Sequence, residues 1–139
     1  MKKLVALLLS MIMIFAATGV FAQDVAVIVI DEQVEFDRAP IVEEDTLYIP
    51  LRFVAEKLGA TVAWDGETKS VFVSVEGILS SLQIGNAKIF SNGEEYVPYK
   101  APVLAENRTL VTSDVIERML GVKVAWDKDA GIATVNKID

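Results

Sequence analysis

The amino-acid sequence predicts an α+β fold in which an antiparallel sheet is twisted around two short helices. Three observations favour this class: apolar residues with a helical period, apolar residues that alternate as in a strand, and a second occurrence of both patterns further along. We expect two repeats of ββ-α-ββ type, at about residues 28–75 and 82–136. The segment between them is too short and too apolar for a flexible linker, so both repeats should pack as one domain.

The first 22 residues have the pattern of a secretory signal peptide. A positive start, Met1–Lys3, precedes an apolar run to Ala17, and small residues precede Gln23 where cleavage would occur. The predicted organisation is therefore a signal peptide, residues 1–22, followed by a domain, residues 23–139. An uncleaved anchor is the alternative, but it would need about 20 apolar residues. We expect a secreted protein with no membrane association after signal removal.

Strands are expected before the first helix. Val25–Ile30 is β-branched, and the turn after it leads into the alternating stretch Gln33–Phe36. Two shorter strands, Ile41–Val42 and Leu47–Ile49, flank the acidic turn Glu43–Thr46.

Residues 49–75 predict a helix followed by a hairpin. Pro50 suits the first helical turn and Gly59 suits the residue after the last turn. The apolar residues between them recur on one helical face: Leu51, Val54, Ala55 and Leu58. Asp65-Gly66 then forms the turn between two strands whose inward residues alternate: Val62 and Trp64, then Val71, Val73 and Val75.

The second half begins after a junction, Glu76–Ser81, with strands at Leu82–Ile84 and Ala87–Phe90 and a tight turn at Asn92-Gly93. The second helix should start near Thr112 or Ser113, either of which can cap its free N–H groups. It should end at Gly121 and bury four apolar residues: Val115, Ile116, Met119 and Leu120. The last hairpin returns along Ile132–Asn136.

The two halves align without a gap, residues 39–73 on 101–135, so that Trp126 lies 62 positions after Trp64. Ten pairs are identical, among them the Val-Ala-Trp-Asp segments at 62–65 and 124–127. Arg52 and Glu56 correspond to Asp114 and Arg118, with the signs exchanged. Each pair is expected to form a solvated i,i+4 contact worth about 0.2–0.5 kcal/mol.

Charge and composition exclude several function classes. The formal net charge is −7, and it falls to −9 without the two signal lysines, which argues against nucleic-acid partners. The chain has no cysteine, so packing rather than disulfides must hold the domain. It also has no histidine, and we expect no cofactor and no metal.

The segment Tyr48–Ala60, followed by Val62–Asp65, resembles the copper amine oxidase N-terminal-like domain, the secreted bacterial stalk domain. The family pattern continues in the second half as Asn107–Val111, but Thr112–Asp114 stands where Pro-Leu-Arg is expected. The resemblance covers about Val29–Val135. It implies a small antiparallel sheet around a helix and a non-catalytic appended module, with copper and the quinone in a separate catalytic domain.

Aromatic and basic residues give the candidate binding surface: Arg52, Tyr96 and Tyr99. An aromatic platform for sugars could also include Trp64 and Trp126, but we interpret both tryptophans as core residues because each shares a strand face with a valine. Arg52 is expected to brace turn carbonyls of its own repeat rather than to contact a ligand.

Paired carboxylates occur at both hairpin turns, Asp65 with Glu67 and Asp127 with Asp129. They could hold Ca²⁺, but Asp and Gly are ordinary turn residues and neither stretch completes an EF-hand loop. The acidic turn at Glu43–Asp45 is likewise interpreted as solvated. No nucleophile–base pair or phosphate-binding loop is recognisable.

The sequence therefore predicts no enzyme activity. It favours a secreted stalk-like module for binding or scaffolding, with an unidentified extracellular or cell-wall ligand as partner. Self-association through sheet edges is the main alternative. A small carboxylate-dependent hydrolase is the remote one.

Overall fold

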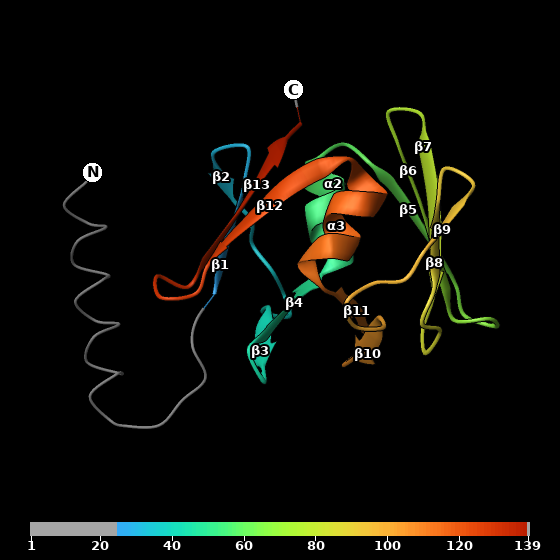
Figure 1. Ribbon diagram of the computed structural model, residues 1–139, viewed down its shortest axis with the longest axis horizontal. Coiled ribbons are helices and arrows are strands. Elements are labelled where there is room, and N and C mark those ends of the chain that lie inside the picture. Colours follow the sequence, from blue (N-terminus) through green and yellow to red (C-terminus); the bar gives the residue numbers. More distant parts are fainter. Residues whose placement is uncertain (1–24, 139) are drawn as a thin grey trace.

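The computed structural model describes residues 25–138, and two helices lie in the space between two of its sheets (Figure 1). The helices are α2 (Leu51–Lys57) and α3 (Ser113–Leu120). A third sheet lies at the end where both helices begin. The segment predicted to be a signal peptide, residues 1–22, lies outside the described range.

The strands form three sheets, and in each list below neighbouring strands are hydrogen-bonded to each other. The first contains β12 (Val122–Asp127), β13 (Ile132–Lys137), β1 (Ala26–Val29) and β2 (Glu32–Gln33). The second contains β5 (Thr61–Asp65), β6 (Ser70–Val75), β7 (Ile78–Gln83), β8 (Ile89–Ser91) and β9 (Glu94–Tyr96). The third contains β10 (Val103–Ala105), β11 (Arg108–Val111), β4 (Thr46–Pro50) and β3 (Ile41–Glu43). Only β1 and β13 pair in parallel among these described strands, so the fold is α+β with mostly antiparallel sheets.

Strand pairing crosses between the two predicted repeats. Strand β4 from the first half pairs with β11 from the second, with Ile49 opposite Val111. Strand β1 near the start pairs with β13 near the end. The order hairpin, helix, hairpin occurs as β3-β4-α2-β5-β6 and as β10-β11-α3-β12-β13, and further strands extend the sheets beyond it.

The expected junction at Glu76–Ser81 is instead a turn and the first part of β7. Glu76 and Gly77 both have positive φ angles, 46° and 84°, and such a pair makes a two-residue turn whose twist suits a hairpin. Strands β6 and β7 are therefore joined directly, with Val75 opposite Ile78.

The strand expected at Gln33–Phe36 ends at Gln33. Val34 still donates its N–H to the carbonyl of Val27 at 2.9 Å. The chain then leaves the sheet, and Phe36 packs edge-on against Phe53 on α2 with ring centroids 5.8 Å apart. Tertiary packing thus overrides the alternating pattern at this point.

The helices end as the sequence predicts. Gly59 after α2 has φ 84°, as expected. Pro50, expected in the first helical turn, is instead the extended last residue of β4, and α2 begins at Leu51. Gly121 takes the left-handed conformation after α3, and its N–H donates to the carbonyl of Glu117 at 3.0 Å.

One hydrophobic core contains side chains from both halves. The face that α3 buries is the predicted one: Val115, Ile116, Met119 and Leu120. Ile49 and Val111 are fully buried where the halves pair. Within residues 25–138, neither helix has the length and apolar character needed to cross a membrane.

Replacing Ile49 with Ala should lower the free energy of unfolding by about 2–5 kcal/mol, because the cavity lies at the centre of the β4–β11 pair. Urea unfolding followed by circular dichroism measures this change. Leu79→Ala is the matched control, since Leu79 is 64% exposed and its truncation should cost less than about 0.5 kcal/mol. Equal losses in the two variants would contradict the assignment of Ile49 to the core centre.

Candidate functional site

A groove of about 470 Å³ lies where the start of α2, the β5–β6 hairpin and the β10–β11 hairpin meet. Apolar, aromatic and basic side chains line it, and none of the described residues in its wall is acidic. The lining consists of Pro50, Leu51, Arg52, Phe53, Val62, Trp64, Val71, Leu104, Asn107, Arg108 and Thr109.

Strand pairing between the halves creates this groove. Leu110 on β11 lies opposite Pro50 at the end of β4, which brings the turn before β11 beside the first turn of α2. On the opposite wall, Val62 and Trp64 are two residues apart and so face the same side of β5.

The interpretation of both tryptophans as core residues is wrong for Trp64. Its side chain is 43% exposed and lines the groove, whereas Trp126 is half-buried against the core. Gly66 lies beside the indole and adds no side chain there, and a Cβ at this position would be in ordinary van der Waals contact with Nε1 at 3.4 Å. Trp126 Nε1 is itself buried and has no hydrogen-bond partner.

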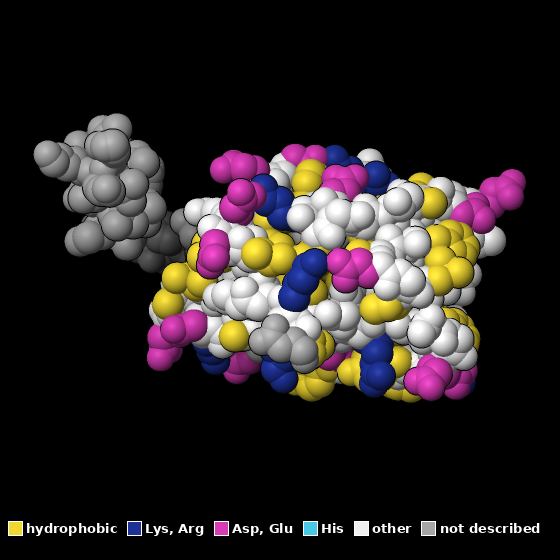
Figure 2. Space-filling view, turned by 90° about the horizontal axis from the view of Figure 1, so that it is seen from above, with side chains coloured by type: hydrophobic (Ala, Val, Ile, Leu, Met, Phe, Trp, Pro, Cys, Tyr) yellow, Lys and Arg dark blue, Asp and Glu magenta, His cyan; other side chains and the backbone are white. Residues whose placement is uncertain are grey.

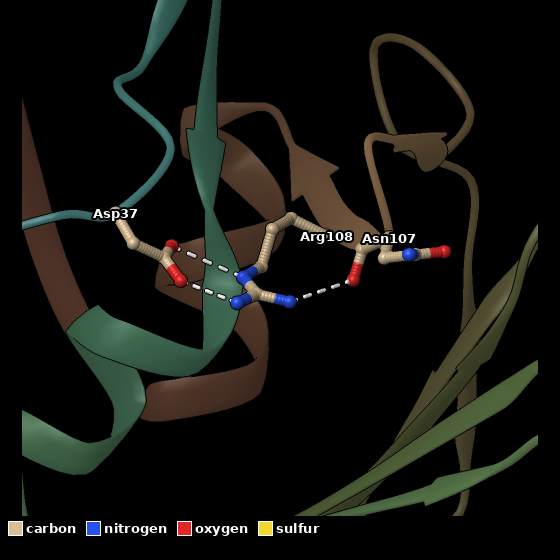
Figure 3. A network of polar contacts seen from close by, with 3 residues as sticks. All are labelled: Asp37, Asn107 and Arg108. Atoms are coloured by element: carbon tan, nitrogen blue, oxygen red, sulfur yellow. Dashed lines mark hydrogen bonds and ion pairs between the residues drawn. The ribbon is translucent and has the colours of Figure 1, made fainter.

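Arg108 is held in a fixed orientation at the rim of the groove (Figure 3). Its Nε donates to Oδ1 of Asp37 at 3.1 Å, its Nη2 pairs with Oδ2, and its Nη1 donates to the carbonyl of Asn107 at 3.1 Å. The hydrogen bonds from Arg108 lower the pKa of Asp37, and the same contact raises the pKa of Arg108. All three guanidinium nitrogens of Arg108 are therefore engaged.

Arg52 also lines the groove but is held more loosely. Its Nη1 lies 3.6 Å from Oε2 of Glu56, which confirms the predicted i,i+4 contact. This distance is longer than that of a good hydrogen bond. The partner of Arg52 is thus a carboxylate on its own helix rather than the expected turn carbonyls.

The sign-exchanged pair Asp114 and Arg118 does not repeat this contact; both residues bind Tyr96. Asp114 accepts hydrogen bonds from the Tyr96 hydroxyl at 2.8 Å and from the Tyr99 N–H at 2.7 Å. The Arg118 guanidinium lies 4.2 Å from the centroid of the Tyr96 ring. Thr112 does not cap α3 as expected, because its hydroxyl bonds to Asp114 instead.

The three predicted binding residues do not form one surface around the groove. Arg52 belongs to the groove wall, while Tyr96 is half-buried beside α3 and Tyr99 is 73% exposed. Burial and the bond to Asp114 raise the pKa of Tyr96, which keeps its hydroxyl a donor.

The model of the copper amine oxidase N-terminal domain family matches residues 28–135. The chain belongs to this family. Comparison with curated proteins and with solved structures found no match. In copper amine oxidases this N-terminal domain is a non-catalytic domain.

The residues of this copper amine oxidase N-terminal domain do not fit a copper centre. Protein copper sites draw on imidazole and thiolate or thioether donors, and the chain has neither histidine nor cysteine. Met119 is the one methionine among residues 25–138, and it is fully buried in the core. Residues 25–138 hold no group of three or more acidic, histidine or cysteine side chains that could bind a metal. The paired turn carboxylates support their own turns: Asp65 accepts from the N–H of Glu67 at 3.0 Å, and Asp127 from that of Ala130 at 3.1 Å.

Sequence reasoning missed Trp64, Asn107 and Arg108 as groove residues. The alignment of the two halves held one indication of a difference here. Gly66 and Asn107 are uncharged, whereas their counterparts Lys128 and Asp45 carry opposite charges. On the face shown in Figure 2, acidic and basic side chains are interspersed, whereas the groove wall carries two arginines and no acid.

Replacing Asp114 with Asn should lower stability at pH 7 by about 1–2 kcal/mol. Burial raises the pKa of Asp114, but hydrogen bonds from Thr112, Tyr99 and Tyr96 outweigh it and leave the pKa lowered. A lowered folded-state pKa gives stability that is present above the unfolded value, near 3.9, and is lost as pH falls through the folded value.

Urea unfolding at pH 7 and pH 3 measures this effect. The wild type should lose more stability on acidification than Asp114→Asn does. Asp129→Asn, at an exposed turn position, should behave as the wild type. An identical acid response in wild type and Asp114→Asn would show that Asp114 does not anchor the 96–100 segment.

Proposed function

We propose that this chain is a secreted, non-catalytic binding module that holds an extracellular ligand in the groove beside α2. The single observation that carries the proposal is the exposed indole of Trp64 in the wall of a concave, mostly apolar site with a few polar groups. Small-ligand sites have this composition. An exposed large aromatic side chain at such a site is typical of recognition rather than of folding.

The proposed location is outside the cell, with the cell wall as the first candidate. This part rests on the signal-peptide pattern of residues 1–22 and on the acidic charge of the chain. The family is compatible with a non-enzymatic role, since its members in copper amine oxidases are non-catalytic domains. Thr109 is the groove's hydroxyl, and none of the described lining residues is a carboxylate or imidazole that could activate it.

We also infer that the body consists of two copies of one ββ-α-ββ unit. Positions 62 apart are equivalent, and Ile49 lies opposite Val111, which is its own equivalent. An antiparallel pair joined at equivalent residues is what a two-fold relation between the copies requires. The turn residues agree, since Asp45 and Asn107 both have φ 65°.

Trp64→Ala should abolish most ligand retention, with a loss of about fivefold or more in affinity, because the groove loses its aromatic wall. Retention of the purified protein on Gram-positive cell walls, glycan resins and immobilised culture-supernatant proteins measures this. Tyr99→Ala is the control, as Tyr99 is an exposed aromatic residue outside the groove. A wild type that none of these materials retains, or a Trp64→Ala variant retained equally, would refute the proposal.

A second candidate function is self-association, and one observation favours it. Strand β5 is at the edge of the five-stranded sheet, and its first four residues, Thr61–Trp64, are uncharged and each at least partly exposed. Uncharged edge strands with unpaired N–H and C=O groups can pair with a second copy.

If β5 pairs between chains, a lysine at Ala63 should weaken that pairing, since Ala63 is exposed and edge charges oppose strand addition. Sedimentation velocity over a range of concentrations should then show dimers for the wild type and monomers for Ala63→Lys. A wild type that stays monomeric at the highest concentration would exclude this function.

A further inference from the structure

The two equivalent tryptophans differ in exposure, since Trp64 is 43% exposed and Trp126 is half-buried. In the second half, Lys128 Nζ in the β12–β13 turn donates to Asp45 Oδ1 in the β3–β4 turn at 2.7 Å. This ion pair joins the two hairpins that correspond to the groove walls. Trp126, on β12 of the same hairpin as Lys128, is half-buried with its Nε1 fully enclosed.

In the first half the same positions hold Gly66 and Asn107. They can form no ion pair, and the groove lies between the β5–β6 and β10–β11 hairpins. The backbone is conserved in shape across the exchange, because Asn107 and Asp45 share φ 65°. Most groove-lining positions also differ from their counterparts in the second half, and only Val62 and Trp64 are identical there, so the groove is a feature of the first half.

The charges of the groove favour an anionic ligand. The chain has 20 acidic and 13 basic residues, yet the described groove wall carries Arg52 and Arg108 and no acid. Arg108 already uses its three nitrogens on Asp37 and the Asn107 carbonyl. Arg52 Nη1 lies 3.6 Å from Glu56 Oε2, so this pair is loose. The guanidinium of Arg52 can therefore donate two parallel hydrogen bonds to a second carboxylate, the geometry that arginine favours.

We propose that the groove binds a glycan whose sugar rings carry carboxylate groups. The apolar face of one ring stacks on the indole of Trp64, and the ring carboxylate pairs with Arg52. The Asn107 amide and the Thr109 hydroxyl, both in the groove wall, meet sugar hydroxyls. This deepens the proposed function and rests on it, because it names the ligand class of the same groove.

A glycan fits better than an acidic peptide because the wall offers an aromatic face and side-chain amide and hydroxyl groups. A sugar ring presents a flat apolar face with hydroxyls around it. The net charge of −7 repels any polyanion at long range, so affinity must come from short-range contacts inside the groove. A polyanion without ring faces should therefore bind poorly.

The full chain is titrated with three probes: hexagalacturonate, its fully methyl-esterified form, and hexaglutamate peptide. Calorimetry gives the affinity, and tryptophan emission shows whether an indole is covered. Hexagalacturonate should bind about tenfold or more tightly than the ester, since the ester lacks the charge-assisted hydrogen bonds. It should also shift the emission to shorter wavelength, and this shift should vanish in Trp64→Phe.

Two substitutions test the contacts directly. Arg52→Gln should reduce the affinity for hexagalacturonate to that for the ester, whereas Glu56→Gln, which frees Arg52 from its own carboxylate, should raise it. The double variant Gly66→Lys with Asn107→Asp introduces the charged pair of the second half across the two turns, removes the Asn107 amide, and should weaken binding. Urea unfolding midpoints confirm that each variant is folded.

The outcomes separate the two levels of the proposal. If the acidic and esterified probes bind equally, or hexaglutamate binds as tightly as hexagalacturonate, the carboxylate-glycan assignment is wrong. If none of the three probes binds while cell walls retain the wild type but not Trp64→Ala, the ligand class is wrong and the binding function stands. If cell walls, glycan resins and supernatant proteins also fail to retain the wild type, the binding function itself fails.

Discussion

The pairing of β4 with β11 is the constraint on which the rest of the structure depends. Ile49 and Val111 lie opposite each other, fully buried, and each strand leads almost directly into a helix. One short ladder therefore fixes where α2 and α3 begin and brings both into a single core. The same ladder carries the β10–β11 turn to the first turn of α2. The groove is thus a consequence of how the halves are joined, and neither half could form it alone.

Local patterns explain which parts of the fold the sequence could predict. The buried face of α3 and the glycines after both helices follow from spacing within ten or so residues, and they are found where expected. The parallel pairing of β1 with β13 joins residues more than a hundred positions apart, and no local pattern specifies it. Phe36 shows the same limit, because its contact with Phe53 ends a strand that alternation alone would extend.

The candidate site was harder to predict because identical residues lie in different surroundings. Trp64 and Trp126 occupy equivalent positions and have the same neighbours along the chain, yet only Trp64 lines the groove. The differences lie outside the identical segment: Trp64 is opposite Val71 and precedes a turn with Gly66, whereas Trp126 is opposite Ala133 and its turn holds Lys128. The predicted contact between Asp114 and Arg118 failed for a similar reason. Their spacing on the helix pairs them with each other, but tertiary packing places Tyr96 against both.

The second half has an ion pair between its two turns that the first half lacks. A lysine at position 66 and an aspartate at 107 would reproduce the ion pair that Lys128 and Asp45 already make on the same backbone. Such an exposed pair is worth little by itself, but it would cover an indole, and burial of apolar surface stabilises a fold by about 25 cal/mol per Å². Folding stability alone therefore favours covering the Trp64 indole. The exposed Trp64 indole thus has a cost in folding stability, and the proposed binding role offers a reason for it, since stability and function often trade off at recognition sites.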